Sequence, residues 1–434
     1  MNRKKSSAID FPLFYIVEQG FKAGLSLDVA ACVRDEIERV GLLDELKTGQ
    51  TVLITAGSRG IGSIVQVLGT LAKEIKKKGA KPVVLPAMGS HGGGTAKGQI
   101  EVLRHLGQTE STLNAPIHDQ LESVQIGESD GFPVVADRAA INADHIILVN
   151  RVKEHTEFIG KIESGLLKMA VVGLGRAAGA DAMHQLAVKR TYQSAIMDIA
   201  RVLFKKLPIC GGIAILEDKN NTVRRIEAIP AADVFEREPD LLKEACEYHA
   251  YLPFDQLDVL LVDEIGKEIS GAGFDTKVIG RIMNIYEKEC EKPKITRIAL
   301  RDLSKKTGGN ALGLGLADFV HKRVVDKMDH AMTALNAITA CAPEKGRVPI
   351  SFDSDRGMLN AAFQSIGPWN PDFVRAAWIS NTADLEELAV SPALADEARS
   401  RGLKVSKDSF TLYFNAKGNL PNLRMVLSKR TVRK

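Results

Sequence analysis

Aromatic side chains are scarce in this chain of 434 residues, and neither sign of charge dominates. Phe, Trp and Tyr together make up 5% of the residues, and 58 Lys and Arg stand against 54 Asp and Glu, for a net charge of +4. Surfaces that bind nucleic acid need clustered basic residues and, for single strands, aromatic rings on which bases stack. The composition therefore predicts that nucleic acid is not a partner.

Paired cysteines and long apolar runs are also missing. The five cysteines form no C-x-x-C and no other tight pair; they are Cys32, Cys210, Cys246, Cys290 and Cys341. Such spacing argues against zinc and iron–sulfur sites of that type and fits reduced thiols. No signal-peptide core follows the basic N-terminus, and no apolar run is long enough to span a membrane. We expect a cytoplasmic protein with no membrane partner.

The length and the apolar pattern together predict two α/β domains. The chain is too long for one ordinary core, and short apolar runs alternate with longer amphipathic ones. We place an N-terminal α/β domain over residues 1–250 and a C-terminal α/β domain over 251–434, with the active site in the cleft between them. The final segment, 405–434, could pack back on the N-terminal domain, and residues 411–414 within it could form a strand.

Three predicted strands of the first domain each lead into a polar or histidine-containing loop. The strands cover residues 51–55, 81–85 and 145–149, and a long helix is expected over about 181–205. Open parallel sheets bind ligands at the carboxyl ends of their strands. The placement of these loops therefore predicts a site, independently of the residue types within them.

Three histidines and a lysine lie in glycine-rich, apolar surroundings. His91 precedes three glycines, His155 follows the third strand, Lys168 lies within an apolar run, and His184 stands sixteen residues beyond that lysine. Imidazole transfers protons near neutral pH and binds metals, and a lysine amine in apolar surroundings tends toward its neutral, nucleophilic form. Each also has a structural interpretation: capping or packing for the histidines, and a snorkelling side chain at a strand edge for Lys168.

The loop after the first strand, at residues 57–62, contains Ser58 and Arg59. It lacks the order G-x-G-x-x-G of dinucleotide-binding loops, so NAD binding of that type is not favoured. Arginine can grip a phosphate or a carboxylate through two parallel hydrogen bonds. The loop is therefore a candidate anion site, and simple turn formation is the alternative.

In their order along the chain, these elements resemble the nickel-dependent lactate racemase family. The resemblance rests on S-R at residues 58–59, G-S-H at 89–91, His155, the S-G-x-x-K element at 164–168, and a histidine sixteen residues beyond its lysine. It is strongest over about residues 50–190. Any one of these elements is weak, but the ordered set is fairly specific.

The resemblance implies a cofactor and residues that hold it. The cofactor would be a nickel pincer nucleotide, a pyridinium mononucleotide whose ring carbon and two sulfurs bind nickel. Lys168 would hold it covalently through a thioamide, with Ser58 as a further cofactor-binding residue. His184 would supply the protein's nickel ligand, which suits square-planar nickel. Arg59 would bind an anionic group, by preference the carboxylate of the substrate.

The activity implied is racemisation or epimerisation of a 2-hydroxy acid by reversible hydride transfer to that cofactor. His91 and His155 would be the acid/base pair, because two imidazoles can take and return the hydroxyl proton from either orientation of the substrate. The hydride needs an electron sink that no side chain provides. Enzymes that synthesise the cofactor would be partners, and the sequence does not indicate an oligomeric state.

Three features depart from the family's pattern. Ala56 stands where the family often has aspartate, three additional residues separate His155 from the S-G-x-x-K element, and Lys267 is only a candidate for a basic substrate-binding residue of the C-terminal domain. These differences favour a 2-hydroxy acid other than lactate, or a sugar acid epimerised at its second carbon. Two alternatives stay open: a nucleotide-dependent oxidoreductase on the same fold, and a non-catalytic binding protein for small anionic metabolites.

Overall fold

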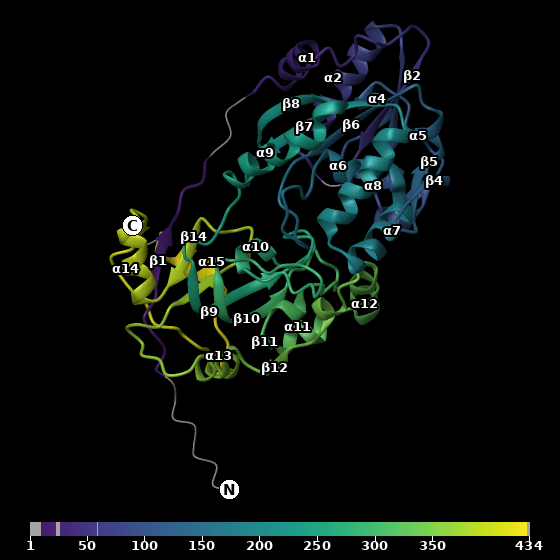
Figure 1. Cartoon of the computed structure of the whole chain (residues 1–434). Coiled ribbons are helices and arrows are strands. Elements are labelled where there is room, and N and C mark those ends of the chain that lie inside the picture. The colour runs from purple at the N-terminus through teal and green to yellow at the C-terminus, as the bar shows by residue number, and fades with distance from the viewer. Residues whose placement is uncertain (1–9, 23–26, 59, 432–434) are drawn as a thin grey trace. The chain divides into compact units, whose positions relative to one another are not determined.

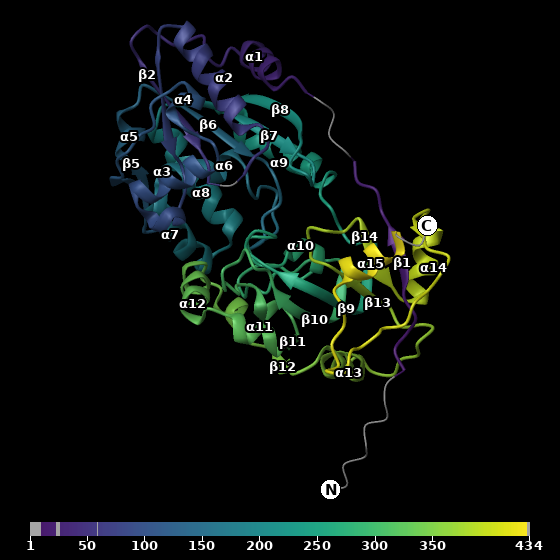
Figure 2. The same ribbon diagram turned by 180° about the vertical axis from the view of Figure 1, so that it is seen from behind.

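The protein divides into two compact units, each built around one large mixed sheet. The structure is a computed structural model that describes residues 10–22, 27–58 and 60–431. The N-terminal unit is Lys22–His249, and the C-terminal unit combines residues 10–21 with the described chain from Ala250 onward (Figures 1 and 2). No helix in the described part of the chain is long and apolar enough to cross a membrane.

The main sheet of the N-terminal unit has five strands in the order β3-β2-β6-β7-β8. The strands from β3 to β7 are parallel, and β8 is antiparallel to β7; β4 and β5 form a separate antiparallel pair. The bounds are β2 (Thr51–Ala56), β3 (Lys81–Pro86), β4 (Ser123–Ser129), β5 (Phe132–Asp137), β6 (His145–Arg151), β7 (Ile209–Glu217) and β8 (Val223–Pro230).

Helices flank this sheet and follow the predicted alternation with strands. They are α1 (Val29–Arg39), α2 (Ile64–Lys77), η1 (His91–Gly94), α3 (Ala96–His105), α4 (Glu110–Leu113), α5 (Arg138–Asn142), α6 (Leu166–Lys168), η2 (Met169–Leu174), α7 (Gly175–Lys189), α8 (Tyr192–Lys206), η3 (Ala231–Asp233) and α9 (Val234–Cys246). The expected strands at the first three loops are therefore present, each within one or two residues of its predicted bounds.

The two faces of the N-terminal sheet pack against different helices. On one face, Val52 of β2 belongs to one apolar cluster with Val33 of α1 and Val67 of α2. On the other face, a Cβ atom at Gly212 of β7 would lie 2.8 Å from Leu166 Cδ1. Because successive strand residues point to opposite faces, the missing side chain at Gly212 lets α6 approach the sheet closely.

Residues 166–189 form a helical run in three parts. The first turn, α6, continues into η2, a π-helical stretch, and then into α7, whose helical geometry is interrupted at Arg176 with φ 54° and ψ −147°. The strand-edge interpretation of Lys168 is therefore wrong, because that apolar run is helical and lies against the sheet.

The single long helix predicted over 181–205 is in fact two helices, α7 and α8. Arg190 leaves the helical region with φ −135° and ψ −109°, which ends α7. Thr191 then begins α8, since its side-chain hydroxyl accepts the Ser194 N–H at 3.2 Å. A hydroxyl that caps a helix in this way stabilises a new start.

The sheet of the C-terminal unit has eight strands in the order β12-β11-β10-β9-β13-β14-β1-β15. The strands from β12 to β13 are parallel, whereas β14, β1 and β15 pair antiparallel. The strands are β1 (Tyr15–Glu18), β9 (Gln256–Ile265), β10 (Lys294–Leu303), β11 (Phe319–His321), β12 (Ile350–Phe352), β13 (Ala376–Ile379), β14 (Glu387–Val390) and β15 (Lys404–Val405). The helices are α10 (Thr276–Ile279), η4 (Leu314–Leu316), α11 (Lys322–Lys327), α12 (His330–Thr339), η5 (Pro343–Gly346), α13 (Asp355–Gln364), α14 (Pro392–Ser400) and α15 (Leu423–Thr431).

Both ends of the described chain belong to the C-terminal unit. Tyr15 of β1 pairs with Val390 of β14, and Val17 pairs with Val405 of β15. This differs from the expectation that the first residues belong to the N-terminal domain and that residues 405–434 return to it. Residues 411–414 form no strand, although Phe410 just before them makes an isolated bridge with Phe14.

A buried arginine fastens the end of the chain to this unit. Arg301 of β10 donates to Asp263 Oδ1 at 2.5 Å, to Asp355 Oδ2 at 2.9 Å and to the Leu420 carbonyl at 2.6 Å. The same carboxylates accept backbone N–H groups of the chain end, with Leu420 N 2.9 Å from Asp355 and Leu423 N 2.6 Å from Asp263. Complementary polar groups therefore hold residues 420–423 in place.

Candidate active site

Ser58 and His91, from the loops after β2 and β3, meet in the N-terminal unit. The Ser58 hydroxyl is hydrogen-bonded to Nδ1 of His91. Because β2 and β3 are adjacent and parallel, their carboxyl ends lie at the same edge of the sheet. Arg59, which follows Ser58 in the sequence, lies outside the described residues.

The glycines after His91 shape a tight left-handed loop. Gly92, Gly93 and Gly94 all have positive φ, near 64–68°. A Cβ atom at Gly92 would lie 2.3 Å from the backbone carbon of Gly98, so only glycine allows this close approach of loop and helix. The glycines therefore place His91 immediately ahead of α3.

His155 and Lys168 form a second pair. Lys168 Nζ is hydrogen-bonded to Nε2 of His155, and both side chains are half-buried. The other ring nitrogen, Nδ1, accepts the Glu157 backbone N–H at 3.1 Å. Phe158 lies against the imidazole, with ring centroids 5.0 Å apart. Backbone and aromatic contacts thus fix the plane of the His155 ring.

The Glu157 contact also determines which nitrogen of a neutral His155 ring carries the proton. A neutral imidazole accepts a hydrogen bond at only one of its nitrogens. Since Nδ1 of His155 accepts from Glu157, a neutral ring carries its proton on Nε2, which faces Lys168.

A buried carboxylate organises the loop between His155 and the S-G-x-x-K element. Glu163 Oε2 accepts the His155 backbone N–H at 2.5 Å, and its Oε1 accepts the Gly160 N–H at 3.1 Å. The side chain of Glu163 is buried. The loop between His155 and the S-G-x-x-K element is therefore folded around an internal acceptor.

Gly165 and Glu238 set the start of the helical run that carries Lys168. Glu238 of α9 accepts the Leu167 N–H at 2.9 Å, and a Cβ atom at Gly165 would lie 2.4 Å from its carboxyl carbon. On the opposite side, Asn150 at the end of β6 donates to the Gly165 carbonyl at 2.8 Å. The glycine of the S-G-x-x-K element is thus needed because a carboxylate occupies the space of a side chain.

The surroundings of Glu238 favour the protonated form of its carboxyl group. Burial raises its pKa to about 7, and the N–H groups of Leu166 and Leu167 oppose that shift. Its Oε1 makes no hydrogen bond to any residue that the structure describes. A carboxyl group that titrates near neutrality therefore lies at the first turn before Lys168.

His184, on α7, joins the same neighbourhood through Tyr192. The His184 ring meets the edge of Tyr192 at 5.7 Å, and the His155 ring lies 6.2 Å from the same tyrosine. Tyr192 also stacks on Phe158, with 5.2 Å between centroids. An aromatic cluster at the start of α8 therefore brings His155 and His184 to one place, and Lys168 is bonded to the first of them.

The loops that contain Ser58 and His91 both pack against the helical run that carries Lys168. A Cβ atom at Gly57, next to Ser58, would lie 3.4 Å from Met169 Cε, one residue after Lys168. A Cβ atom at Gly89, two residues before His91, would lie 3.0 Å from Ala180 and 3.3 Å from Val172. Glycines therefore let both loops approach the Lys168 helix closely.

Glu217 anchors the loop that contains Ser58. Lying at the end of β7, it accepts from Arg151 at 2.5 Å and from the backbone N–H of Gly62. Burial raises the pKa of Glu217, and the Arg151 guanidinium opposes that effect. The ends of β6 and β7 thus fix the loop that follows β2.

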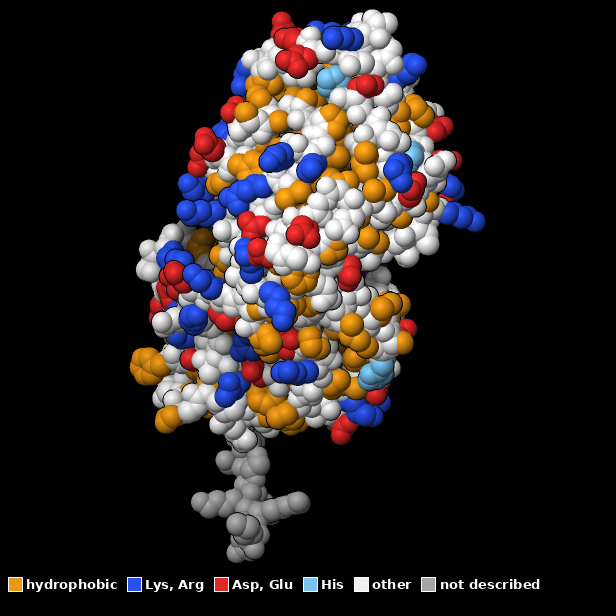
Figure 3. Space-filling view, turned by 45° about the vertical axis from the view of Figure 1, so that its right-hand side comes forward, with side chains coloured by type: hydrophobic (Ala, Val, Ile, Leu, Met, Phe, Trp, Pro, Cys, Tyr) orange, Lys and Arg blue, Asp and Glu red, His pale blue; other side chains and the backbone are white. Residues whose placement is uncertain are grey.

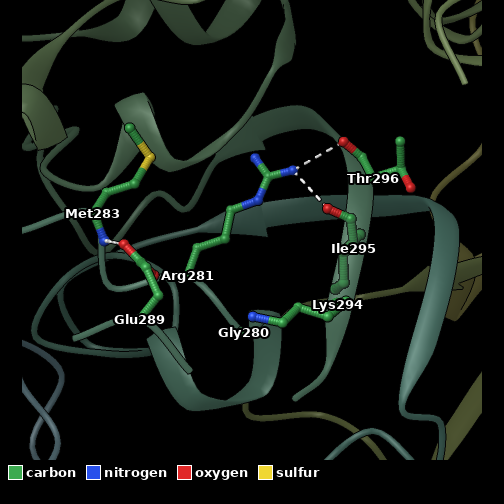
Figure 4. A pocket seen from close by; sticks show the side chains of 7 residues that line it. All are labelled: Gly280, Arg281, Met283, Glu289, Lys294, Ile295 and Thr296. Carbon is green, nitrogen blue, oxygen red and sulfur yellow. Dashed lines mark hydrogen bonds between the residues drawn. The ribbon is translucent and has the colours of Figure 1, made fainter. Parts of the chain in front are cut away.

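The C-terminal unit offers different features. Lys267 Nζ donates to the Gly271 carbonyl at 2.6 Å within its own glycine-rich loop. A hollow elsewhere in this unit is lined by Arg281, Glu289 and Thr296, but Arg281 is bonded to the Ile295 and Thr296 carbonyls (Figure 4). None of the predicted site residues lines that hollow.

Two observations bear on the whole molecule. On the face drawn in Figure 3, acidic and basic side chains are interspersed, as the balanced composition suggests. Among the residues that the structure describes, no three His, Cys, Asp or Glu side chains are grouped so that they could hold a metal ion.

Known proteins resemble this chain in fold and, over one segment, in sequence. The fold is similar to that of a solved structure, the lactate racemase apoprotein from Thermoanaerobacterium thermosaccharolyticum, with a TM-score of 0.52 at 15% identity, over 85% of this chain and 99% of that one. Residues 36–195 match the family described as lactate racemase N-terminal domain. All of the predicted site residues of the N-terminal unit lie within that matched segment. No curated protein matches the chain.

Sequence reasoning missed several residues of the site. Tyr192, Glu238 and Glu163 were not singled out, although each contacts the predicted residues or their backbone. Glu238 acts on Leu167 from 71 residues away, so no local pattern could link them. Glu163 gave the one available signal, because it is an acidic residue directly before the S-G-x-x-K element.

Proposed function

We propose that the protein is a racemase or epimerase of a 2-hydroxy acid that works with a nickel pincer nucleotide. The observation that carries the proposal is the gathering of Lys168, His155 and His184 around Tyr192, within the segment that matches the lactate racemase domain. The departures from the family's pattern favour a 2-hydroxy acid other than lactate, including sugar acids. The location of the site in a cleft between the domains stays a prediction.

The residues present fit such a cofactor. Lys168 offers an amine that can be acylated, and His184 offers an imidazole on the same helical run. The chain supplies no cluster of three metal ligands in its described part, which suits a metal that comes with donors of its own. When bound, the cofactor would supply the two-electron acceptor that inversion through a ketone requires and that side chains lack.

The proton transfers fall to His91 and His155. Inversion through a ketone requires that the hydroxyl proton be taken on one side of the carbon and returned on the other. Two imidazoles, one on each side of the carbon, can perform both directions. Ser58 orients one of them through Nδ1 of His91, and the Glu157 N–H orients the other through Nδ1 of His155.

Binding of the substrate carboxylate is assigned to Arg59. The loop that contains it begins at the carboxyl end of β2 and is anchored by Glu217 through Gly62. A guanidinium binds a carboxylate through two parallel hydrogen bonds, which fixes both the distance and the orientation of the acid. Ser58 is the second cofactor-binding residue of the proposal, together with Lys168.

The experiment is loading followed by a substrate screen. The chain is co-expressed with the enzymes that make the cofactor, and the purified protein is analysed by intact mass, peptide mapping and nickel content. Chiral chromatography then follows each of a panel of 2-hydroxy acids and sugar acids. We expect an adduct on Lys168, about one nickel per chain, and inversion of at least one acid.

Controls separate the alternatives. Lys168→Ala should abolish the adduct, whereas Lys189→Ala, which changes an exposed lysine on α7, should leave it unchanged. No adduct and no nickel, under conditions that load an established family member, would overturn the proposal. Retention of NAD in that experiment would instead favour a nucleotide-dependent oxidoreductase.

A further inference from the structure

Arg176 combines a buried charged side chain with a strained backbone, and each of these costs free energy. Its side chain is fully buried, and this burial lowers its pKa, an effect that the Asp137 carboxylate opposes. Its backbone, at φ 54° and ψ −147°, lies in a region that glycine adopts readily and other residues avoid. Such strain persists only where the surroundings hold it in place, and it gathers at functional sites.

The surroundings that hold Arg176 come from two other elements. Nη1 donates to Asp137 Oδ2 at 2.9 Å, at the end of β5, and Nε donates to Gln99 Oε1 at 2.9 Å, on α3. Nη2 donates to the same Gln99 oxygen. Asp137 in turn caps α5 by accepting the Ala139 N–H at 2.9 Å. The guanidinium is therefore bound on both of its sides.

Gln99 connects Arg176 to the loop that contains His91. Because its Oε1 accepts from Arg176, its amide NH₂ must face the other way. That group donates to the Met88 carbonyl at 3.1 Å and to the Gly89 carbonyl at 2.9 Å. Gly89 precedes His91 by two residues. A continuous chain of buried hydrogen bonds thus runs from Arg176 to the backbone that presents His91.

Arg176 also lies midway along the helical run of the site. It is eight residues after Lys168 and eight residues before His184. We propose that Arg176 and Gln99 are positioning residues that fix His91 relative to the helical run that carries Lys168 and His184. The inference rests on the proposed function, in which His91 exchanges a proton with a substrate bound beside that run.

The size of the effect follows from the geometry of proton transfer. A general acid or base must come within hydrogen-bond reach of the proton that it moves. A displacement of about 1 Å at a catalytic group costs on the order of 100-fold in rate. Release of the two loop carbonyls from Gln99 should therefore lower kcat and leave substrate binding, assigned to Arg59, nearly intact.

Two substitutions of Gln99 test this proposal. Gln99→Glu keeps the acceptor for Arg176 but loses the donors to the Met88 and Gly89 carbonyls. Gln99→Met loses both contacts and keeps the volume. We expect kcat of the loaded enzyme to fall about 10- to 100-fold in each, with KM changed by less than about threefold.

A second readout needs neither cofactor nor turnover. In the unloaded protein with labelled histidine, both variants should shift the NMR signals of the His91 ring, which is bonded to Ser58. The signals of His145, which contacts Gln50 on another side of the unit, should stay in place. Because this measurement is made on the unloaded chain, it decides the positioning role even where the proposed racemase activity fails.

The matched control is Gln108→Met. Gln108 is also a buried glutamine, just after α3, and its side-chain amide makes no hydrogen bond to any described residue. This variant should retain the kcat and the His91 signals of the unchanged protein. His91 signals and kcat that stay unchanged in both Gln99 variants, with the fold verified by circular dichroism, would overturn the proposal.

Discussion

Among the residues that the structure describes, each unit buries one arginine, and each of the two is bonded to carboxylate and carbonyl oxygens. The two hydrogen-bond networks have different structural roles. Arg301 of the C-terminal unit has ordinary backbone geometry, and its partners Asp263, Asp355 and the Leu420 carbonyl secure the end of the chain. Arg176 of the N-terminal unit has a strained backbone, and Gln99 connects it to the loop of a candidate acid/base. One network stabilises the fold, and the other holds two loops in a required position.

The buried carboxylates of the two units show the same contrast. Burial raises the pKa of Asp263, and the Arg301 guanidinium opposes that effect. In Glu238 only backbone N–H groups oppose the effect of burial, and its pKa is raised to about 7. Glu238, beside the candidate site, is therefore less fully compensated than Asp263, and carboxyl groups with a raised pKa are common at functional sites.

The largest effect should come from Arg301→Met. It leaves Asp263 and Asp355 buried without their cation and frees the chain end, so we expect a loss of about 3–5 kcal/mol in the free energy of unfolding, measured by urea denaturation. Arg297→Met on the same strand is the control, because that half-buried arginine contacts Ser365 and carbonyls only, and should cost about 1 kcal/mol. Equal losses in the two variants would show that the Arg301 network does not secure the fold.

Arg176→Met should cost less, about 2–4 kcal/mol, because it leaves one buried carboxylate, Asp137, without its cation, whereas Arg301 pairs with two. The comparison that isolates the strain is Arg176→Gly against Arg176→Ala, since both remove nearly the same side chain. Glycine adopts φ 54° and ψ −147° without penalty, so Arg176→Gly should be more stable than Arg176→Ala by about 1–2 kcal/mol in urea denaturation. A glycine variant no more stable than the alanine variant would mean that Arg176 is not strained.

Glu238→Gln should change how stability depends on pH. The pKa of Glu238 is raised in the folded state from 4.5 to about 7, so the native protein binds this proton more tightly than the unfolded chain does. Stability from this group is therefore present at low pH and is lost as the pH rises from about 4.5 to about 7. Between about pH 5 and pH 8 the unchanged protein should lose about 2 kcal/mol relative to the variant.

The control for this measurement is Glu236→Gln, an exposed position on the same helix. Urea denaturation at both pH values should give this variant the pH dependence of the unchanged protein. A Glu238→Gln variant that follows the same pH dependence would contradict the raised pKa of Glu238.

The smallest and most local effect should come from His155→Phe. Phenylalanine cannot hydrogen-bond Lys168 Nζ and makes its surroundings more apolar, which favours the uncharged, nucleophilic amine. The rate at which trinitrobenzenesulfonate modifies Lys168, followed by peptide mass mapping, should therefore rise about threefold to tenfold. Modification of Lys189, exposed at the end of α7, serves as the internal reference and should not change.

The parts of this protein that sequence reasoning predicted are those that local patterns determine. Contiguous apolar runs identified β2, β3 and β6, and the structure brings Ser58 and His91 together from the loops after β2 and β3. The break between α7 and α8 was missed, because a Thr cap inside an otherwise helical pattern is a weak signal. Arg176 and Gln99 are 77 residues apart, and only the folded sheet brings them together.

The pairing of β1 has a consequence for how the protein is made. This strand leaves the ribosome before its partners β14 and β15, which follow more than 360 residues later, as in the pairing of Tyr15 with Val390. At a synthesis rate of roughly 5–20 residues per second, β1 waits for tens of seconds without its neighbours. The continuous segment from Lys22 to His249 can fold during that interval. Fusions or truncations at the N-terminus should therefore impair the last step of maturation, closure of the C-terminal sheet, before they affect the unit that carries Lys168.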